Sequence, residues 1–257
     1  MEIQNKNIIN HLKLNMNSNI YNIIGAVAVL FIIYMVVLQN IMKKKKQQQL
    51  ADFNTNHSGN PLTEQQNRLL TFGAILFYWR SENILGIALE KNLDMYVYGL
   101  KHQWDITNRE EAKDTLNSLL LLNKSESFKP LLQQPTEENI KIRKKIAKGL
   151  GIELSVVEQT QSAYAWDICR AVSLTKWCYW CGYLTEDETW AYMEEAAQIA
   201  NQHGKDWTDY TVSFLLGRTI QGFELDELIV ESKQLLNGDS LYKNKENSDI
   251  YKRYSFS

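Results

Sequence analysis

The feature that most constrains the fold of this chain is a long stretch without a charged residue near its N-terminus. From Leu14 to Met42 the sequence contains no Asp, Glu, Lys or Arg, and the most apolar part is Ile20–Met42. Because an α-helix rises ~1.5 Å per residue, this part is long enough to cross the hydrocarbon core of a bilayer. Helices buried inside soluble proteins seldom run this far without a charge, so we predict a transmembrane helix over residues 20–42.

The residues that flank this helix predict its orientation. Lys43, Lys44, Lys45 and Lys46 follow it directly, whereas residues 1–19 carry only scattered charges among many asparagines. Lysine-rich flanks stay in the cytoplasm, so we predict a single-pass protein of the inner (cytoplasmic) membrane, with its N-terminus outside and its C-terminal domain in the cytoplasm. No small-residue cleavage site follows the apolar run, which favours an uncleaved anchor over a signal peptide. The lysines can also contact anionic lipid head groups.

The rest of the chain has the composition of a helical protein. It is rich in Glu, Gln, Lys, Leu and Ala, and 3 prolines and 12 glycines in the whole chain argue against a β-sandwich. We interpret residues 43–61 as a basic and polar linker, residues 62–238 as a compact multi-helix all-α domain, and residues 239–257 as a flexible tail. The formal net charge of -2 is too small for a nucleic-acid footprint, so we expect no nucleic-acid partner.

Capping signals and apolar spacing predict where the helices of this domain begin and end. Thr63, Thr107 and Thr185 each stand three residues before a Gln or Glu, which is the spacing of a capping box. We expect one long helix over residues 154–181, and a loop over residues 124–135 because that stretch contains two prolines. No alternating apolar run is long enough to predict a sheet.

The long predicted helix carries aromatic and polar residues on one face. They follow one another at spacings of four, three, four and three residues: Trp166, Arg170, Ser173, Trp177 and Trp180. Apolar residues on the opposite face predict that this helix is the central one of a bundle. Asp167 and Arg170 on this helix, and Arg218 in a later apolar segment, need partners if they are buried. We therefore expect a buried network that joins Asp167 to Arg170 or Arg218.

These residues are part of a longer signature that resembles the bacterial domain-of-unknown-function 1266 family. In that family a W-D-x-x-R element leads to a W-x-x-x-G-Y turn, an acidic helix, a further tryptophan and a G-R element. The matching residues here are Trp166, Asp167, Arg170, Trp177 (or Trp180), Gly182, Tyr183, Glu186, Glu188, Trp190, Trp207, Tyr210, Gly217 and Arg218. The segment Trp104–Leu120 is similar to the family's upstream pattern, whereas Cys178 and Cys181 stand where the family tends to have smaller residues. The resemblance implies a helical fold and no established activity.

The candidate site residues come from the same signature. We predict a polar network as the candidate binding site: Asp167, Arg170, Tyr183 and Arg218. The motif aromatics expected around it are Trp166, Trp177, Trp190, Trp207 and Tyr210. Two interpretations stay open: a network that only fixes helix packing, which we favour, and a pocket in which the two arginines recognise a carboxylate or phosphate.

Other residue patterns predict no catalytic or metal site. Cys178 and Cys181 have C-x-x-C spacing, but they stand at the C-terminal end of a predicted helix, where the dipole does not lower a thiol pKa. A zinc site would need Cys169 or His203 as further ligands, so buried small residues are the favoured interpretation. We assign no cofactor, no metal and no catalytic residue, because no nucleophile pattern or phosphate loop is present.

The sequence therefore predicts a membrane-tethered cytoplasmic domain that binds a protein partner or an anionic ligand, and the prediction leans away from catalysis. The alternative is an enzyme acting on an anionic, phosphate- or carboxylate-bearing substrate. In that case Asp167 or a motif glutamate would be the general base, and Arg218 would stabilise charge. A defence or toxin-immunity component is a weaker alternative.

Overall fold

The computed structural model describes residues 24–45, 47–48, 51–52, 54, 61–89, 92–238 and 249–257. Contacts divide the chain into two compact units, Met1–Asn56 and His57–Ser257, and the division falls inside the predicted linker. The predicted outer segment 1–19, and residues 239–248 of the predicted tail, lie outside the described residues.

The described part of the first unit contains one long apolar helix, Ile24–Lys45. It has 22 residues, and among the described residues it is the one helix long and apolar enough to cross a membrane. Its large apolar side chains are exposed, among them Leu30 at 66% and Phe31 at 61%. Burying apolar surface is favourable by about 25 cal/mol per Å². The helix therefore needs an apolar environment that the described part of this unit does not supply.

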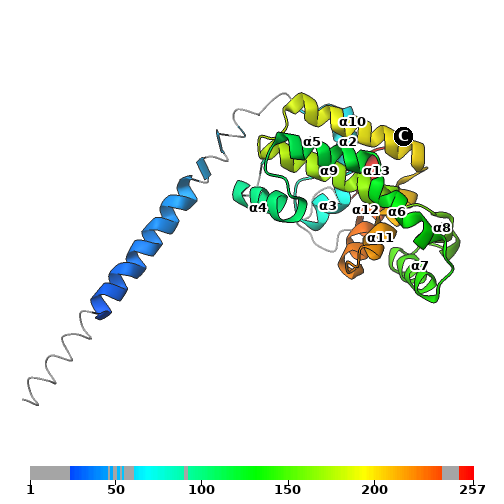
Figure 1. The fold of residues 1–257 in the computed structure, drawn as a ribbon, viewed down its shortest axis with the longest axis horizontal. Helices are drawn as coiled ribbons and strands as arrows, with labels where there is room; N and C mark the ends of the chain where they lie inside the picture. The colour runs from blue at the N-terminus through cyan, green and yellow to red at the C-terminus, as the bar shows by residue number, and fades with distance from the viewer. Residues whose placement is uncertain are drawn as a thin grey trace, which may run out of the picture. The chain divides into compact units, whose positions relative to one another are not determined.

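The second unit is helical, and the part of it that the structure describes contains no strand (Figure 1). Its helices are α2 (Glu64–Thr71), α3 (Ala74–Trp79), α4 (Leu93–Trp104), α5 (Arg109–Leu120), α6 (Asn123–Gln133), α7 (Glu137–Leu150), α8 (Leu154–Gln159), α9 (Tyr164–Trp180), α10 (Glu186–His203), α11 (Trp207–Ile220), α12 (Asp226–Asn237) and α13 (Ile250–Arg253). The predicted all-α class, an apolar helix followed by a helical domain, is confirmed.

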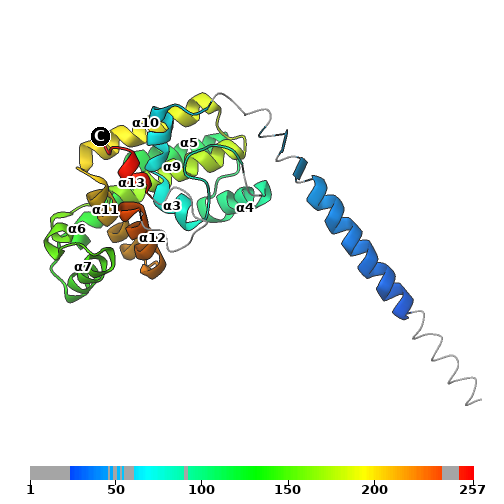
Figure 2. The ribbon, with the colours of Figure 1, turned by 180° about the vertical axis from the view of Figure 1, so that it is seen from behind.

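Helix α9 forms the centre of this domain. Every residue of α9 except Arg170 is buried, as predicted for a helix that is apolar on both faces. Helices α10, α11 and α5 pack along it, and α3, α4 and α6 also contact it. Figures 1 and 2, seen from opposite sides, show α4 and α7 at opposite ends of the domain. The residues of α9 are therefore reached by side chains from most of the other helices.

The single long helix predicted over residues 154–181 is wrong, because it is interrupted at residues 160–163 between α8 and α9. The buried guanidinium of Arg143 is responsible for part of this break. Its Nη1 donates to the backbone carbonyls of Val157, at 2.5 Å, and Thr160, at 3.0 Å. These bonds satisfy carbonyls that would otherwise bond further along a continuous helix. An arginine from α7 thus contributes to the break between α8 and α9.

The loop predicted over residues 124–135 is also wrong, because most of it is the helix α6. Ser125, Phe128 and Leu132 are buried on one face at helical spacing. Their burial outweighs the missing amide of the proline inside the helix. The backbone nitrogen of Ser125 also donates to Oδ2 of Asp167 at 2.8 Å, which caps the first turn with a carboxylate from α9.

The capping signals are correct at two of the three predicted positions. Thr63 and Thr185 each form a complete capping box at the start of α2 and α10. At α5 the cap lies one residue later than predicted. Asn108 Oδ1 accepts from the backbone nitrogen of Glu111 at 3.0 Å, while the carboxylate of Glu111 bonds back to Thr107. The carboxamide of Asn108 therefore replaces the expected threonine hydroxyl.

The prediction of a flexible tail is wrong for residues 249–257. This segment contains α13, and Tyr251 and Phe256 are 7% and 6% exposed. The ring of Tyr251 stacks on Trp207 with 4.3 Å between centroids, and Trp207 Nε1 donates to the backbone carbonyl of Tyr254 at 2.7 Å. The end of the chain is part of the core because its aromatic rings fill a space beside α11.

Candidate functional site

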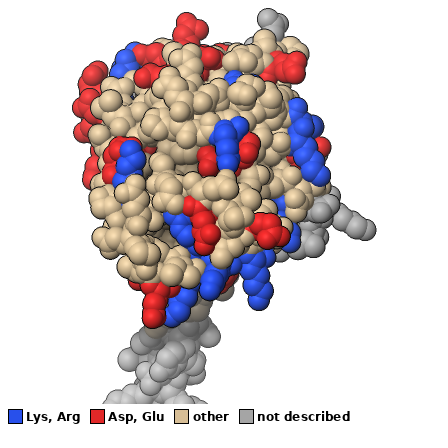
Figure 3. Space-filling model, turned by 90° about the vertical axis from the view of Figure 1, so that its right-hand side faces the viewer, with Lys and Arg blue, Asp and Glu red and all other residues tan. Residues whose placement is uncertain are grey.

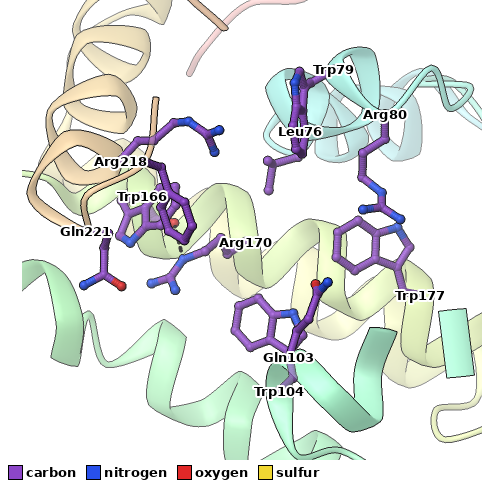
Figure 4. Close-up of a pocket in the computed structure, with 11 residues that line it drawn as sticks. Leu76, Trp79, Arg80, Gln103, Trp104, Trp166, Arg170, Trp177, Arg218 and Gln221 are labelled. Carbon is purple, nitrogen blue, oxygen red and sulfur yellow. Dashed lines mark hydrogen bonds between the residues drawn. The ribbon is translucent and has the colours of Figure 1, made fainter. Parts of the chain in front are cut away.

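A cavity of about 530 Å³ opens beside the central helix, on the face that carries Arg170 (Figure 4). It is lined by Leu76, Trp79, Arg80, Gln103, Trp104, Trp166, Arg170, Trp177, Arg218, Gln221 and Phe223. These residues come from α3 and the residue after it, from α4, from α9, and from α11 and the turn that follows it. The volume falls within the range of about 300–1,000 Å³ that is typical of small-molecule sites.

Each of the three arginines in the cavity wall is fixed at its Nε. Arg80 Nε donates to Glu82 Oε1 at 2.8 Å. Arg170 Nε donates to the backbone carbonyl four positions earlier at 2.9 Å, and Arg218 Nε donates to that of Glu224 at 2.8 Å. A guanidinium carries five N–H donors in one plane, so fixing Nε sets the direction of the Nη edge.

Aromatic rings flank these guanidinium groups. Arg170 Cζ lies 4.4 Å from the ring centre of Trp166 and 5.5 Å from that of Trp104. Arg80 Cζ lies 4.7 Å from the ring centre of Trp177. Such contacts stabilise a cation by about 0.5–2 kcal/mol. The indoles therefore order the arginines without neutralising their charge.

Buried carboxylates hold two of the three arginines from behind the cavity wall. Glu82 pairs with Arg80, and its Oε2 accepts from Trp177 Nε1 at 3.0 Å. Asp167 is fully buried and pairs through Oδ1 with Arg170, while its Oδ2 caps α6. Burial lowers the pKa of the Arg170 guanidinium, and the charge of Asp167 opposes this shift. Neither carboxylate lines the cavity.

Arg218 differs from the other two, because in the described residues its side chain hydrogen-bonds to a carbonyl and to no carboxylate. Nε donates to Glu224, while Nη1 and Nη2 have no acceptor there. Its Cζ lies 5.2 Å from the ring centres of both Trp79 and Phe223. Burial lowers the pKa of the Arg218 guanidinium, opposed by the charge of Glu227, but an arginine stays protonated at neutral pH. Figure 4 shows this guanidinium extending from α11 toward Trp79. It brings two open Nη groups to the cavity.

The cavity contains two of the four residues predicted as a polar network, Arg170 and Arg218. Asp167 stands behind Arg170, so the expected ion pair between them is present, whereas no hydrogen bond joins Asp167 to Arg218. Tyr183 does not line the cavity. It is half-buried in the turn after α9, where its backbone nitrogen donates to the carbonyl of Cys178 at 2.9 Å.

The aromatic residues of the motif also fall into two groups, those that line the cavity and those that do not. Trp166 and Trp177 line the cavity. Trp190 is half-buried on α10, and its Nε1 donates to a glutamate one turn earlier at 3.3 Å. Trp207 and Tyr210 belong to the core beside the C-terminal segment, with 5.5 Å between their ring centroids. These last three residues therefore support the fold and do not form the cavity.

Sequence reasoning missed the parts of the wall that come from α3 and from the turn after α11. Trp79 and Arg80 stand together at the end of an apolar segment, which is a signal that could have drawn attention to them. In the sequence, Trp104 is identified only as the start of a family pattern. Phe223 and Gln221 give no signal in the sequence, because they reach the cavity only through the packing of α11 against α9.

The cysteines do not line the cavity. Cys169 and Cys178 are buried, Cys181 is half-buried, and all three are free. Burial raises the pKa of Cys169 and of Cys181 to about 12, so their reactive thiolate forms are strongly disfavoured at neutral pH. Among the described residues, no group of three or more His, Cys, Asp or Glu side chains is arranged to hold a metal ion.

The fold and the cavity together define a class of protein: an all-α domain, preceded in the chain by an apolar helix, with an arginine- and tryptophan-lined cavity on its central helix. The chain belongs to the family described as Protein of unknown function (DUF1266), whose model matches residues 99–252. This confirms the predicted family. The cavity residues of α4, α9 and α11 lie inside the match, and those of α3 lie before it. No curated protein and no solved structure matches the chain.

Proposed function

We propose that this protein is a membrane-tethered domain that binds an anionic ligand in the cavity between α3, α4, α9 and α11. The observation that carries the proposal is the charge of the cavity wall, in which three of the lining residues are arginines and none is a carboxylate. The planar guanidinium matches a carboxylate or phosphate with two parallel hydrogen bonds. A ligand that bears such a group is therefore the complement of this wall.

Arg218 provides the strongest support within that wall. A guanidinium that is partly withdrawn from water loses hydration free energy, which an acidic partner normally offsets. In the described residues Arg218 hydrogen-bonds to the backbone carbonyl of Glu224 and leaves both Nη groups open. A bound anion would accept from both, and a hydrogen bond to a charged group contributes about 1.5–3 kcal/mol.

A purely structural role for the arginines accounts for less of the site. It explains Arg170, whose partner Asp167 is buried and also caps α6. It does not explain an open cavity of about 530 Å³ that Arg80, Arg170 and Arg218 line. Small-molecule sites are concave spaces of this size, so the cavity has room for a ligand.

An enzyme acting on an anionic substrate is the second candidate function. Asp167 is a poor general base for it, because Asp167 is fully buried and both its oxygens accept hydrogen bonds from within the domain. Glu82 is 7% exposed and is likewise bonded to Arg80 and Trp177. The cavity wall offers cations and aromatic rings, which supports binding more directly than proton transfer.

The tether in this proposal is the segment 20–42, inserted in the cytoplasmic membrane with residues 1–19 outside. Support comes from the apolar, exposed helix Ile24–Lys45 and from the lysines that follow the apolar run, Lys43–Lys46. Lysines at the cytoplasmic end of a span set its orientation and attract anionic lipids. The cavity would then face the cytoplasm.

Calorimetric titration of the full-length protein in a neutral detergent tests the binding proposal. With inorganic pyrophosphate and citrate as probes at constant ionic strength, we expect saturable binding of at least one. Arg218→Gln should weaken it by about tenfold or more, because it removes the bidentate donor. Arg109→Gln is the matched control, since Arg109 is an exposed arginine on α5 that does not line the cavity. Equal binding by the parent and Arg218→Gln, or no saturable binding by the parent, would contradict the proposal.

A further inference from the structure

We infer that the ligand of this cavity is a nucleotide, in which a phosphate is joined to a planar nitrogen heterocycle. The inference rests on the proposed function, because it assigns the phosphate to the same arginines. Its new basis is the rest of the wall, which is aromatic and carries two carboxamides. Each of these features matches a different part of such a ligand.

Every aromatic ring of the wall lies near an arginine, and two of these residues also keep substantial exposed surface. Trp79, Trp104, Trp166, Trp177 and Phe223 line the cavity. Trp79 is 37% exposed and Phe223 is 51% exposed, so each keeps ring surface that protein atoms do not cover. Bases stack readily on such rings, and one stacked base changes affinity by roughly tenfold or more. The wall therefore suits a ligand with a flat ring.

Two carboxamides complete the wall. Gln103 and Gln221 line the cavity, and their side chains make no hydrogen bond with the other residues that the structure describes. A carboxamide presents a donor and an acceptor side by side, which matches the edge of a base such as adenine. Figure 4 shows Gln103 beside Trp104, between Arg170 and Trp177 in that view. A simple oxyanion has only acceptors and would leave the carbonyl of each amide unused.

Two other ligand classes fit the wall less well. Aromatic cages that lack arginine suit quaternary ammonium groups, but here Arg80, Arg170 and Arg218 would repel a cation. A neutral aromatic compound would stack on the indoles and leave the Nη groups of Arg218 without an acceptor. The ring and the negative charge are therefore required in one molecule.

Four probes separate the parts of this inference in the full-length protein in neutral detergent: AMP, adenosine, ribose 5-phosphate and inorganic pyrophosphate. We expect AMP to bind at least tenfold more tightly than either adenosine or ribose 5-phosphate. We also expect AMP to quench tryptophan fluorescence, because its base stacks on an indole, whereas ribose 5-phosphate should not. These measurements use the parent protein, so they do not depend on whether any variant folds.

Matched variants then assign the contacts. The rings of Trp79 and Trp104 each also lie near an arginine, so a loss of phosphate affinity is measured with ribose 5-phosphate. At least one of Trp79→Leu and Trp104→Leu should weaken AMP binding by fivefold or more beyond the factor by which it weakens ribose 5-phosphate binding. Trp190→Leu is the control, since Trp190 is a half-buried tryptophan that does not line the cavity. Arg218→Gln should weaken the binding of AMP and of ribose 5-phosphate by the same factor, because both ligands present a phosphate.

The outcomes distinguish the failure of this inference from that of the proposed function. Equal affinities for AMP, ribose 5-phosphate and pyrophosphate, all weakened by Arg218→Gln, would overturn the nucleotide and leave the anion site standing. AMP binding that neither tryptophan variant changes would also overturn the nucleotide. Adenosine bound as tightly as AMP and independently of Arg218, or no binding of any of these four probes or of citrate, would overturn both.

Discussion

Arg170 and Arg218 lie on two packed helices and line the same cavity, yet the protein holds them in different ways. Arg170 is paired with Asp167, whose carboxylate is fully buried. Arg218 lies against the rings of Trp79 and Phe223, and it hydrogen-bonds to a backbone carbonyl. The first arrangement is part of the core, while the second leaves a positive charge open to the cavity. The two arginines should therefore respond differently when their surroundings are changed.

Stability measurements can separate these two roles. Asp167→Asn should lower the free energy of unfolding by about 3 kcal/mol or more, because it leaves the buried charge of Arg170 without its partner. Arg218→Gln should lower it by less than about 1 kcal/mol, because it breaks no ion pair in the described residues. Urea unfolding of the full-length protein, followed by tryptophan fluorescence, measures both. Losses of equal size would indicate that Arg218 is a structural residue.

At the scale of the helices, Gly217 determines how closely α11 packs on α9, and Arg218 follows it directly in the chain. A Cβ atom at Gly217 would lie 2.4 Å from Cβ of Trp166, closer than two non-bonded carbon atoms can approach. The absence of a side chain lets α11 pack directly on α9. That close approach carries Arg218 and Phe223 to the cavity wall. The motif residue is thus needed for packing, and its neighbour becomes available for binding.

The contact between α5 and α10 should make stability sensitive to acid. Hydrogen bonding from Lys113 and from the backbone of Thr185, together with the charge of Arg109, lowers the pKa of Glu188 from 4.5 to about 2. Because the folded-state pKa is depressed, this stabilisation is present above pH 4.5 and is lost as the pH falls toward 2. Glu188→Gln should therefore reduce the fall in Tm between pH 4.5 and pH 2.

A second glutamate on α10 supplies the control for this measurement. Glu195 is exposed and makes no ion pair in the described residues, so Glu195→Gln should keep the acid dependence of the parent. Parallel melting curves for the parent and Glu188→Gln across this pH range would rule out the assigned role.

The C-terminal segment should contribute strongly to stability, because its rings fill part of the core. The ring of Phe256 lies 5.0 Å from that of Trp207 and 5.6 Å from that of Phe72. Phe256→Ala should lower the free energy of unfolding by about 3 kcal/mol or more, because it removes buried surface and leaves a cavity. Phe223→Ala is the control, because Phe223 is 51% exposed and should cost less than about 1 kcal/mol. An unchanged free energy of unfolding in Phe256→Ala would indicate that this segment is a flexible tail.

At the scale of the whole molecule, the net charge is small. The formal net charge is -2, and on the face shown in Figure 3 acidic and basic side chains are interspersed. A mixed surface of this kind creates no strong long-range field. In the proposed function, selection depends instead on the cavity, where Arg218 has no carboxylate partner in the described residues and the dielectric constant is lower than in water.

Fractionation tests the proposed membrane tether. The full-length protein should stay with the membranes after an alkaline carbonate wash, because the helix Ile24–Lys45 is long enough to span them. Removal of residues 1–46 should move the protein to the soluble fraction. In sealed vesicles with the cytoplasmic face inside, the predicted orientation protects residues 62–257 from added protease. Replacing Lys43–Lys46 with asparagine should reduce that protection, because these lysines set the orientation. Full-length protein in the soluble fraction would contradict the tether.

The features that the sequence by itself determined are those that depend on neighbouring residues. The apolar run from Ile20 to Met42, the capping boxes at Thr63 and Thr185, and the two-sided burial of α9 each depend on hydrophobicity or hydrogen bonds within a few residues. Helical period and cap geometry are local properties, so a single sequence is enough to predict them. The ion pair between Asp167 and Arg170 follows from the same rule, since the two lie three residues apart.

Tertiary structure alone decided the features that join distant parts of the chain. Arg143 binds the carbonyls at the end of α8, Asp167 caps α6, and residues 249–257 return to pack on Trp207. The cavity draws its wall from segments between Leu76 and Phe223. The entropy of loop closure changes only slowly with loop length, so it hardly favours one distant contact over another. Close packing of side chains is far more selective, and it therefore determines which remote residues meet. For that reason the sequence could single out Arg218, but the two rings and the carbonyl that hold it beside the cavity are evident only in the fold.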